Sequence, residues 1–217
     1  MSTTAKVYLD TNVYKFSATA IPMFRLQQMK TYNWGSQVIS LPVYDPILDN
    51  PNDRIDNLEL KAEADLLPEV AALASGGRVT FMESMESRME GMFLPKMASQ
   101  TGLFYGAKVV TVAEPVQYSR VVFGGPEDPS QAQFNFLSSL GEKRFVELQK
   151  IVGAHQGIGK PPNRNQLLDA FHLWCAEHHD CDYFLSLDFK LAKVVSKAKA
   201  KPKVQIVRPS ELLAATK

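Results

Sequence analysis

Two short apolar runs, far apart in the chain, each lead directly into an aspartate. Residues 7–9 precede Asp10, and residues 183–187 precede Asp188. Apolar runs of this length that end in polar residues predict buried β-strands, and open α/β folds bind their ligands at the carboxyl ends of such strands. The pattern leaves a second interpretation open, in which each aspartate caps the helix that follows its strand.

The rest of the hydrophobic pattern switches between helical and strand periodicity. Apolar residues at helical spacing predict helices over 58–74, 131–152 and 165–178. Short apolar runs predict further strands over 78–82, 108–113 and 204–207. Strands that alternate with helices imply right-handed parallel crossovers. We therefore expect an α/β fold with a central parallel sheet of about five strands and helices on both faces.

The chain length of 217 residues fits a single domain over residues 1–217. Two stretches, near 16–57 and 102–129, contain several proline or glycine residues and little clear periodicity. We expect both to be irregular insertions packed beside the core.

Composition and charge narrow the function only slightly. The chain is 45% hydrophobic and 22% charged, with a net charge of +1, so its total charge gives no sign of a nucleic-acid partner. No apolar run approaches the length of a membrane span, and the N-terminus lacks a signal-peptide core. We expect a soluble, cytoplasmic protein with no membrane partner.

A third aspartate, Asp169, interrupts the apolar face of the helix predicted over 165–178. A doubly wound sheet would bring it close to Asp10 and Asp188. A carboxylate among apolar residues is unfavourable unless it is paired, hydrogen-bonded or bound to a cation, and converging carboxylates form an oxygen site suited to Mg²⁺ or Mn²⁺. The alternative for Asp169 is a solvent-facing position beside the apolar stripe.

Three segments together resemble a PIN-domain nuclease of the VapC type. They are Leu9-Asp10-Thr11-Asn12, the helix that runs from Leu168-Asp169 to Ala176, and Cys181 to Asp188. The resemblance implies a metal-dependent ribonuclease on a central parallel sheet, with Mg²⁺ or Mn²⁺ as cofactor. Many such domains are bacterial toxins that have a protein antitoxin.

The resemblance also implies roles for individual residues. Asp10, Asp169 and Asp188 would be catalytic and would bind the metal, and Thr11, Asn12 and Ser186 would orient them. A glutamate on the helix after the second strand would complete the site. Glu86 is our choice because it lies one helical turn past that strand, while Glu83 and Glu90 remain open.

Several lysines follow Asp188 directly. Lys190, Lys193 and Lys197 can contact the phosphate backbone of an entering nucleic acid. The alternative is an ordinary solvated helix end.

We therefore expect an endoribonuclease that hydrolyses the phosphodiester bonds of RNA at an acidic Mg²⁺ or Mn²⁺ site, and that acts as a toxin of a toxin–antitoxin pair. The alternative is a catalytically inactive PIN-like module that binds nucleic acid or serves as a scaffold. The partners considered are an RNA substrate, an antitoxin protein and a second copy of the chain. A haloacid dehalogenase-type phosphatase is disfavoured because Asn12 stands where its second aspartate is needed.

Overall fold

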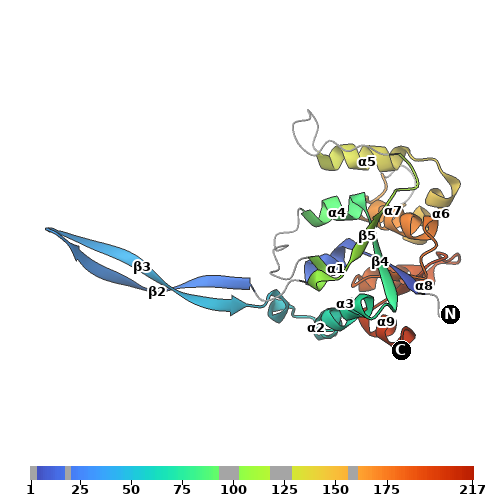
Figure 1. Cartoon of the computed structure of the whole chain (residues 1–217). Helices are drawn as coiled ribbons and strands as arrows, with labels where there is room; N and C mark the ends of the chain where they lie inside the picture. Colours follow the sequence, from blue (N-terminus) through green and yellow to red (C-terminus); the bar gives the residue numbers. More distant parts are fainter. Residues whose placement is uncertain (1–3, 18–20, 93–102, 118–128, 156–160) are drawn as a thin grey trace.

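Five parallel strands form the central sheet, as the hydrophobic pattern predicts. The computed structural model describes residues 4–17, 21–92, 103–117, 129–155 and 161–217. The strands of the sheet are β1 (Ala5–Leu9), β4 (Val79–Ser84), β5 (Val109–Val112), β6 (Tyr183–Leu185) and β7 (Gln205–Val207). Their order is β5-β4-β1-β6-β7, and every neighbouring pair is parallel (Figure 1). The predicted α/β class is confirmed.

This strand order fixes where a ligand can bind. From β1 the chain moves outward through β4 to β5, and then returns to the other side of β1 to form β6 and β7. The direction of winding therefore reverses between β1 and β6. In open α/β sheets, ligands bind outside the carboxyl ends of the strands at this point.

Alternating residues of the strands divide the core between the two faces of the sheet. Tyr8 and Phe184 belong to one buried cluster, whereas Val7, Leu9 and Leu185 belong to the other. The first face is covered by α5 (Pro129–Ser139), α6 (Lys143–Ile151), α7 (Arg164–His178) and α8 (Phe189–Lys197). The second is covered by α1 (Thr11–Phe16), α2 (Leu58–Asp65), α3 (Leu67–Ser75) and α9 (Pro209–Ala215). Helices on both faces confirm the expected layering.

Two predicted helices are each divided in the structure. The helix expected over 58–74 breaks between α2 and α3, where Pro68 occupies the first turn of α3. The helix expected over 131–152 breaks near Gly141 into α5 and α6. Both interruptions follow from the backbone, because proline suits a helix start and glycine weakens a helix interior.

The expectation of irregular structure over 16–57 is wrong for most of that stretch. Residues 21–49 form an antiparallel hairpin of β2 (Ile21–Trp34) and β3 (Gln37–Asp49), followed by the short helix η1 (Pro51–Arg54). Figure 1 shows the hairpin extending away from the α/β body. The prolines that suggested irregularity are tolerated because each strand of a two-stranded ribbon has an outer edge that needs no N–H donor.

The second expected insertion, 102–129, is only partly described. It contains the short helix η2 (Leu103–Gly106) and then β5, an edge strand of the sheet. Residues 102 and 118–128 lie outside the described part of the chain. None of the helices in the described part is long and apolar enough to cross a bilayer.

Candidate acidic site at the carboxyl edge of the sheet

The Asp10 carboxylate lies at the winding reversal and joins β1 to β6. Its Oδ2 accepts hydrogen bonds from Ser186 Oγ and from Asn12 Nδ2, each at 2.6 Å. Asn12 Oδ1 in turn accepts from the backbone N–H of Leu187 at 3.0 Å. The side chain of Asp10 makes no capping hydrogen bond to α1, although the residue stands at the N-cap position. The capping interpretation is therefore wrong for Asp10, and Asn12 and Ser186 orient its carboxylate.

Asp188 does cap a helix, as the alternative interpretation proposed. Its Oδ1 accepts from the backbone N–H groups of Lys190 at 2.7 Å and Leu191 at 3.1 Å, at the start of α8. Its own N–H donates to Ser186 Oγ at 3.0 Å. These contacts hold Asp188 at the same edge of the sheet as Asp10.

Asp169 projects from α7 and forms no ion pair with a described residue. It is half-buried, and no hydrogen bond or ion pair reaches it from the residues that the structure describes. Burial and then the negative charge of Asp10 raise the pKa of the Asp169 carboxyl to about 8 against the opposing positive charge of His172, and the charges of Asp188 and Glu90 add to the rise. Asp169 thus interacts electrostatically with the other acids of this edge and does not simply face solvent.

Glu90, rather than Glu86, is the glutamate that contacts the first turn after β1. Both lie on α4 (Met85–Met92), which follows β4. Glu90 Oε2 accepts from Thr11 Oγ1 at 2.8 Å, and it lies 3.1 Å from His172 Nε2. The charge of Glu90 contributes to the raised pKa of Asp10. The structure therefore places Glu90 beside the aspartates.

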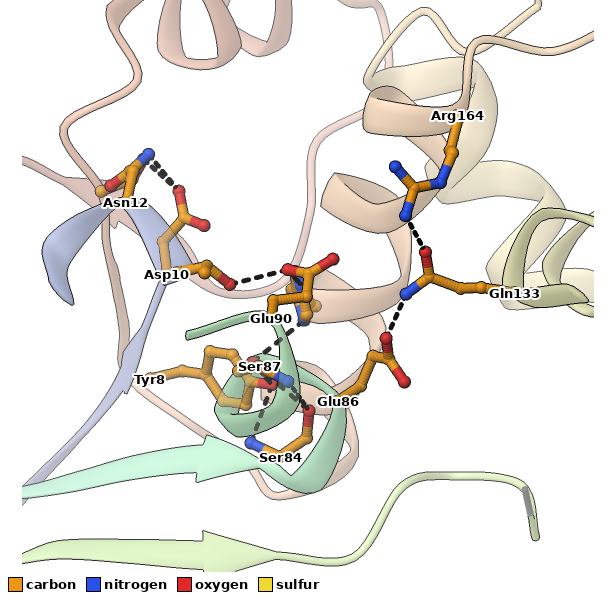
Figure 2. A network of polar contacts seen from close by, with 12 residues as sticks. Tyr8, Asp10, Asn12, Ser84, Glu86, Ser87, Glu90, Gln133 and Arg164 are labelled. Atoms are coloured by element: carbon orange, nitrogen blue, oxygen red, sulfur yellow. Dashed lines mark hydrogen bonds and ion pairs between the residues drawn. The ribbon is translucent and has the colours of Figure 1, made fainter. Parts of the chain in front are cut away.

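Glu86 points in another direction and packs against α5. Its Oε1 accepts a short hydrogen bond from Gln133 Nε2, and Gln133 Oε1 accepts from Arg164 of α7 (Figure 2). The backbone N–H of Glu86 donates to Glu114 Oε1 at 3.1 Å. Glu83, the third possibility, is buried and accepts from the Tyr14 hydroxyl at 2.6 Å. Our choice of Glu86 for the site is replaced by Glu90, since the orientation of α4 directs Glu86 toward α5.

A buried chain of hydrogen bonds supports Glu90 from behind. His172 Nδ1 lies 3.1 Å from Ser87 Oγ, and that hydroxyl lies 3.0 Å from Tyr8 Oη. Tyr8 Oη also accepts from the backbone N–H of Ser84 at 3.1 Å. Burial opposes a charge on His172, but the hydrogen bond and charge of Glu90 raise the pKa of its imidazole to about 9. A protonated His172 then holds Glu90 as a carboxylate.

The pKa values of the acids follow from this arrangement. Burial raises the pKa of Asp10 above its ordinary value, against the opposing hydrogen bond from Ser186. Burial acts in the same direction on Glu90, but the hydrogen bond and positive charge of His172 lower its pKa below the ordinary value. The positive charge of His172 also acts on Asp169, but burial and the charge of Asp10 outweigh it, and no hydrogen bond from the described residues reaches this carboxyl. In the absence of a metal ion, the Asp169 carboxyl keeps a proton at neutral pH.

The donor chemistry suits a hard divalent cation, since the cluster offers carboxylate oxygens at one edge of the sheet. In the described part of the chain, all hydrogen bonds of the Asp10 carboxylate fall on Oδ2, which leaves Oδ1 for a ligand. The described residues contain no group of three or more His, Cys, Asp or Glu side chains already arranged to hold a metal ion. The residues fit such an ion by charge and donor type, and they would have to draw closer around it.

The predicted basic residues lie beside the acids. Lys190, Lys193 and Lys197 are exposed on α8, the helix that Asp188 caps. Ser186, Asp188, Lys193 and Arg208 line an open cleft of about 450 Å³. Lys193 is thus the lysine of the three that faces the same depression as an acid of the site. Lys201, by contrast, donates to the last carbonyls of α8.

Comparison with known proteins adds no relationship. No protein-family model matches the chain, and no curated protein sequence matches it significantly.

Proposed function

We propose that the chain is a Mg²⁺- or Mn²⁺-dependent endoribonuclease. The observation that carries the proposal is Asp169, a half-buried carboxylate whose pKa is raised by burial and by the charges of three other acids, and which forms no ion pair with the described residues. A carboxylate in that position is costly unless a cation compensates it. The edge of the sheet at which these acids lie is also where an α/β fold binds its ligand.

Each residue of the site has a separate task in this proposal. Asp10 and Asp169 would hold the cation directly, and Asp188 would reach it directly or through water. Asn12 and Ser186 fix the orientation of the Asp10 carboxylate. The chemistry that Mg²⁺ or Mn²⁺ supplies when bound is activation of a water and stabilisation of negative charge on the phosphate.

Glu90 completes the acidic set. Thr11 and His172 both contact Oε2 of its carboxylate, so Oε1 would serve as a further ligand. Lys193 lies on the adjacent cleft and would contact the RNA backbone. The small net charge of the chain, +1, does not oppose this arrangement, because the contact is local.

The proposal is tested by cleavage of labelled single-stranded RNA by the purified chain, with Mg²⁺ or Mn²⁺ and with EDTA. We expect hydrolysis only with a divalent cation. Asp10→Asn and Asp169→Asn should each lower the rate by at least about 100-fold, because even residues that merely support a metal ligand contribute roughly 10–100-fold. Asp56→Asn makes the same chemical change at an exposed position outside the site and should leave the rate unchanged.

A second pair of variants distinguishes the two glutamates. Glu90→Gln should lower the rate nearly as much as Asp10→Asn, whereas Glu86→Gln should have a smaller effect because its contacts are with α5. Cleavage that persists after exhaustive chelation would refute the metal mechanism. RNA binding without cleavage would favour the inactive binding module. The toxin–antitoxin role belongs to the same proposal, and co-expression with the product of a neighbouring small gene, which should suppress the RNase activity, tests it.

A further inference from the structure

The hairpin of β2 and β3, which we call the arm, packs mainly within itself. Its two strands pair along their length, and Figure 1 shows it extending from the body of the molecule. An isolated two-stranded hairpin is at best marginally stable in water. An arm of this kind therefore needs another surface to pack against.

The apolar side chains of the arm change local face between its base and its tip. Residues directly opposite each other share a face, and faces alternate along a strand. Near the base, Leu26 and its partner Tyr44 lie on the face opposite to the pair Arg25 and Asp45. Near the tip, the apolar residues lie on the other face, the one that carries Asp45 at the base. Tyr32 and its partner Ile39 are on this face.

The twist of the arm brings these two apolar faces to one side. A β-bulge lies between Leu26 and Gln28, where the base meets the tip half, and bulges increase the right-handed twist of a ribbon. Figure 1 shows that the two strands cross once along the arm. We infer that the ribbon turns over between base and tip, which directs opposite local faces to the same side. The arm therefore has one apolar side over its whole length.

The opposite side of the arm is mixed and on balance more polar, although it also carries the exposed Met29 and Val38 near the tip. Arg25 and Asp45 lie there near the base. Near the tip, Thr31 and Ser40 hydrogen-bond to each other at 3.3 Å. This difference between the two sides indicates that a partner covers the apolar side.

The exposed apolar area of one arm is about half of the total area that a specific stable interface buries. Two such arms packed together would supply the full area. Its large side chains, between 42% and 75% exposed, are Phe24, Leu26, Tyr32, Trp34, Leu41 and Tyr44. At roughly 150–250 Å² for a whole aromatic side chain, they expose about 600 Å² in one copy. Two such surfaces together would bury about 1,200 Å², which reaches the range of specific stable interfaces, about 1,200–2,000 Å².

Charge and proline placement indicate what kind of partner fits. The charged residues of 21–49 are Arg25, Lys30, Asp45 and Asp49, so the arm has no net charge to attract a phosphate backbone. Pro42 and Pro46 remove N–H donors from the outer edge of β3. That edge is thus poorly suited to accept an added strand, and the partner must pack on the apolar side.

We propose that the partner is a second copy of the chain, and that the two arms pack antiparallel through their apolar sides. A two-fold axis would pass near Gln28, where the base and tip halves meet. The base residues Phe24 and Tyr44 of one copy would then cover Tyr32 and Trp34 of the other. A two-fold contact of this kind is closed, because each copy uses the same surface, and it therefore does not propagate into fibres.

Size-exclusion chromatography with light scattering tests the association. The wild-type chain should have about twice the mass of 24.2 kDa expected for one copy. Trp34→Ser should weaken the dimer by at least about tenfold, as expected for a buried aromatic anchor. Val38→Ser is the matched control, because Val38 is 71% exposed on the more polar side at the next rung, compared with 75% for Trp34. It should leave the dimer intact.

Cysteine cross-linking tests the orientation of the arms. Under mild oxidation, Gln28→Cys should form an intermolecular disulfide with the same cysteine of the second copy, because residue 28 lies near the two-fold axis. Gln37→Cys lies at the tip and should not, because antiparallel packing separates the two tips. The native thiols, Cys175 and Cys181, are both buried and should not contribute.

Three results would overturn the proposal: a single-copy mass at every concentration, equal effects of Trp34→Ser and Val38→Ser, or preferential cross-linking through Gln37→Cys. A single-copy mass would refute it even if the arm proved to bind another protein. The test is independent of nuclease activity, so its failure leaves the proposed function untouched.

Discussion

Replacement of Asp169 by Asn provides the sharpest test of the acidic site. The substitution keeps the shape of the side chain and removes its charge. In the metal-free protein this carboxyl has a pKa of about 8, because it is buried and lies near the charge of Asp10. The unfolded chain releases the same proton near its ordinary value of 3.8. At neutral pH the folded wild-type protein therefore pays a free-energy cost for this carboxyl, and the uncharged amide of Asp169→Asn would avoid that cost.

The size of the penalty follows from linkage. Between pH 4 and pH 8 the folded state retains a proton that the unfolded state has lost, so the contribution of Asp169 to stability falls as the pH rises. At pH 7 the difference corresponds to about 4 kcal/mol, at 1.36 kcal/mol for each pKa unit. Relaxation and water penetration reduce such penalties. We therefore expect Asp169→Asn to raise the free energy of unfolding at pH 7 by about half of this value, about 2 kcal/mol. For a chain of this size, 2 kcal/mol corresponds to a rise in Tm of roughly 4–8 °C.

The measurement is a series of thermal melts between pH 4 and pH 8 in EDTA and in Mn²⁺. In EDTA at pH 7, Asp169→Asn should melt higher than wild type, and the difference should largely disappear near pH 4. Mn²⁺ should stabilise the wild type more than the variant and so reduce or reverse the difference. Asp56→Asn should follow the wild type under all conditions. A variant that is destabilised at pH 7, or a difference that does not depend on pH, would refute the assignment of Asp169 to a repulsive acid cluster.

Three further perturbations separate structural from functional roles. Asp188→Ala should lower stability by about 0.5–2 kcal/mol in chemical denaturation because α8 loses its cap, whereas Asp188→Asn retains a good cap and should mainly weaken Mn²⁺ binding measured by calorimetry. Tyr14→Phe leaves the buried Glu83 without its donor and should cost about 1–3 kcal/mol, and an unchanged unfolding midpoint would contradict that. Lys193→Gln should reduce the salt dependence of RNA binding by about one phosphate contact, and the matched change Lys199→Gln should not.

Part of this site could be predicted because its determinants are local. Apolar runs that end in Asp10 and Asp188 predicted strand ends, and the winding of an α/β sheet then places those ends at a common edge. Asp169 was recognisable because a carboxylate interrupts an otherwise apolar helix face. The second role of Asp188, as a helix cap, was also a local property, and the structure shows that one aspartate can serve both the helix and the edge of the sheet.

The choice among three glutamates could not be made from sequence. Glu83, Glu86 and Glu90 recur at helical spacing, but which of them reaches the site depends on how α4 packs against α7. The contact between Glu90 and His172 selects Glu90, and these two residues are 82 positions apart in the sequence. His172 was not among the site residues that the sequence indicated. The available signal in the sequence was a histidine within the mainly apolar helix that also carries Asp169.

The arm is the other feature that only the tertiary structure decided. Alternation of apolar and polar residues over 21–49 is obscured by the prolines and by a bulge that shifts the pattern by one residue. Sequence alone thus determined the α/β class and indicated three of the acids of the proposed site, because hydrophobic period and turn chemistry act over a few neighbouring residues. The tertiary structure decided the fourth acid, the support of His172 and the one-sided arm, because these depend on contacts between distant segments and on the twist of a ribbon.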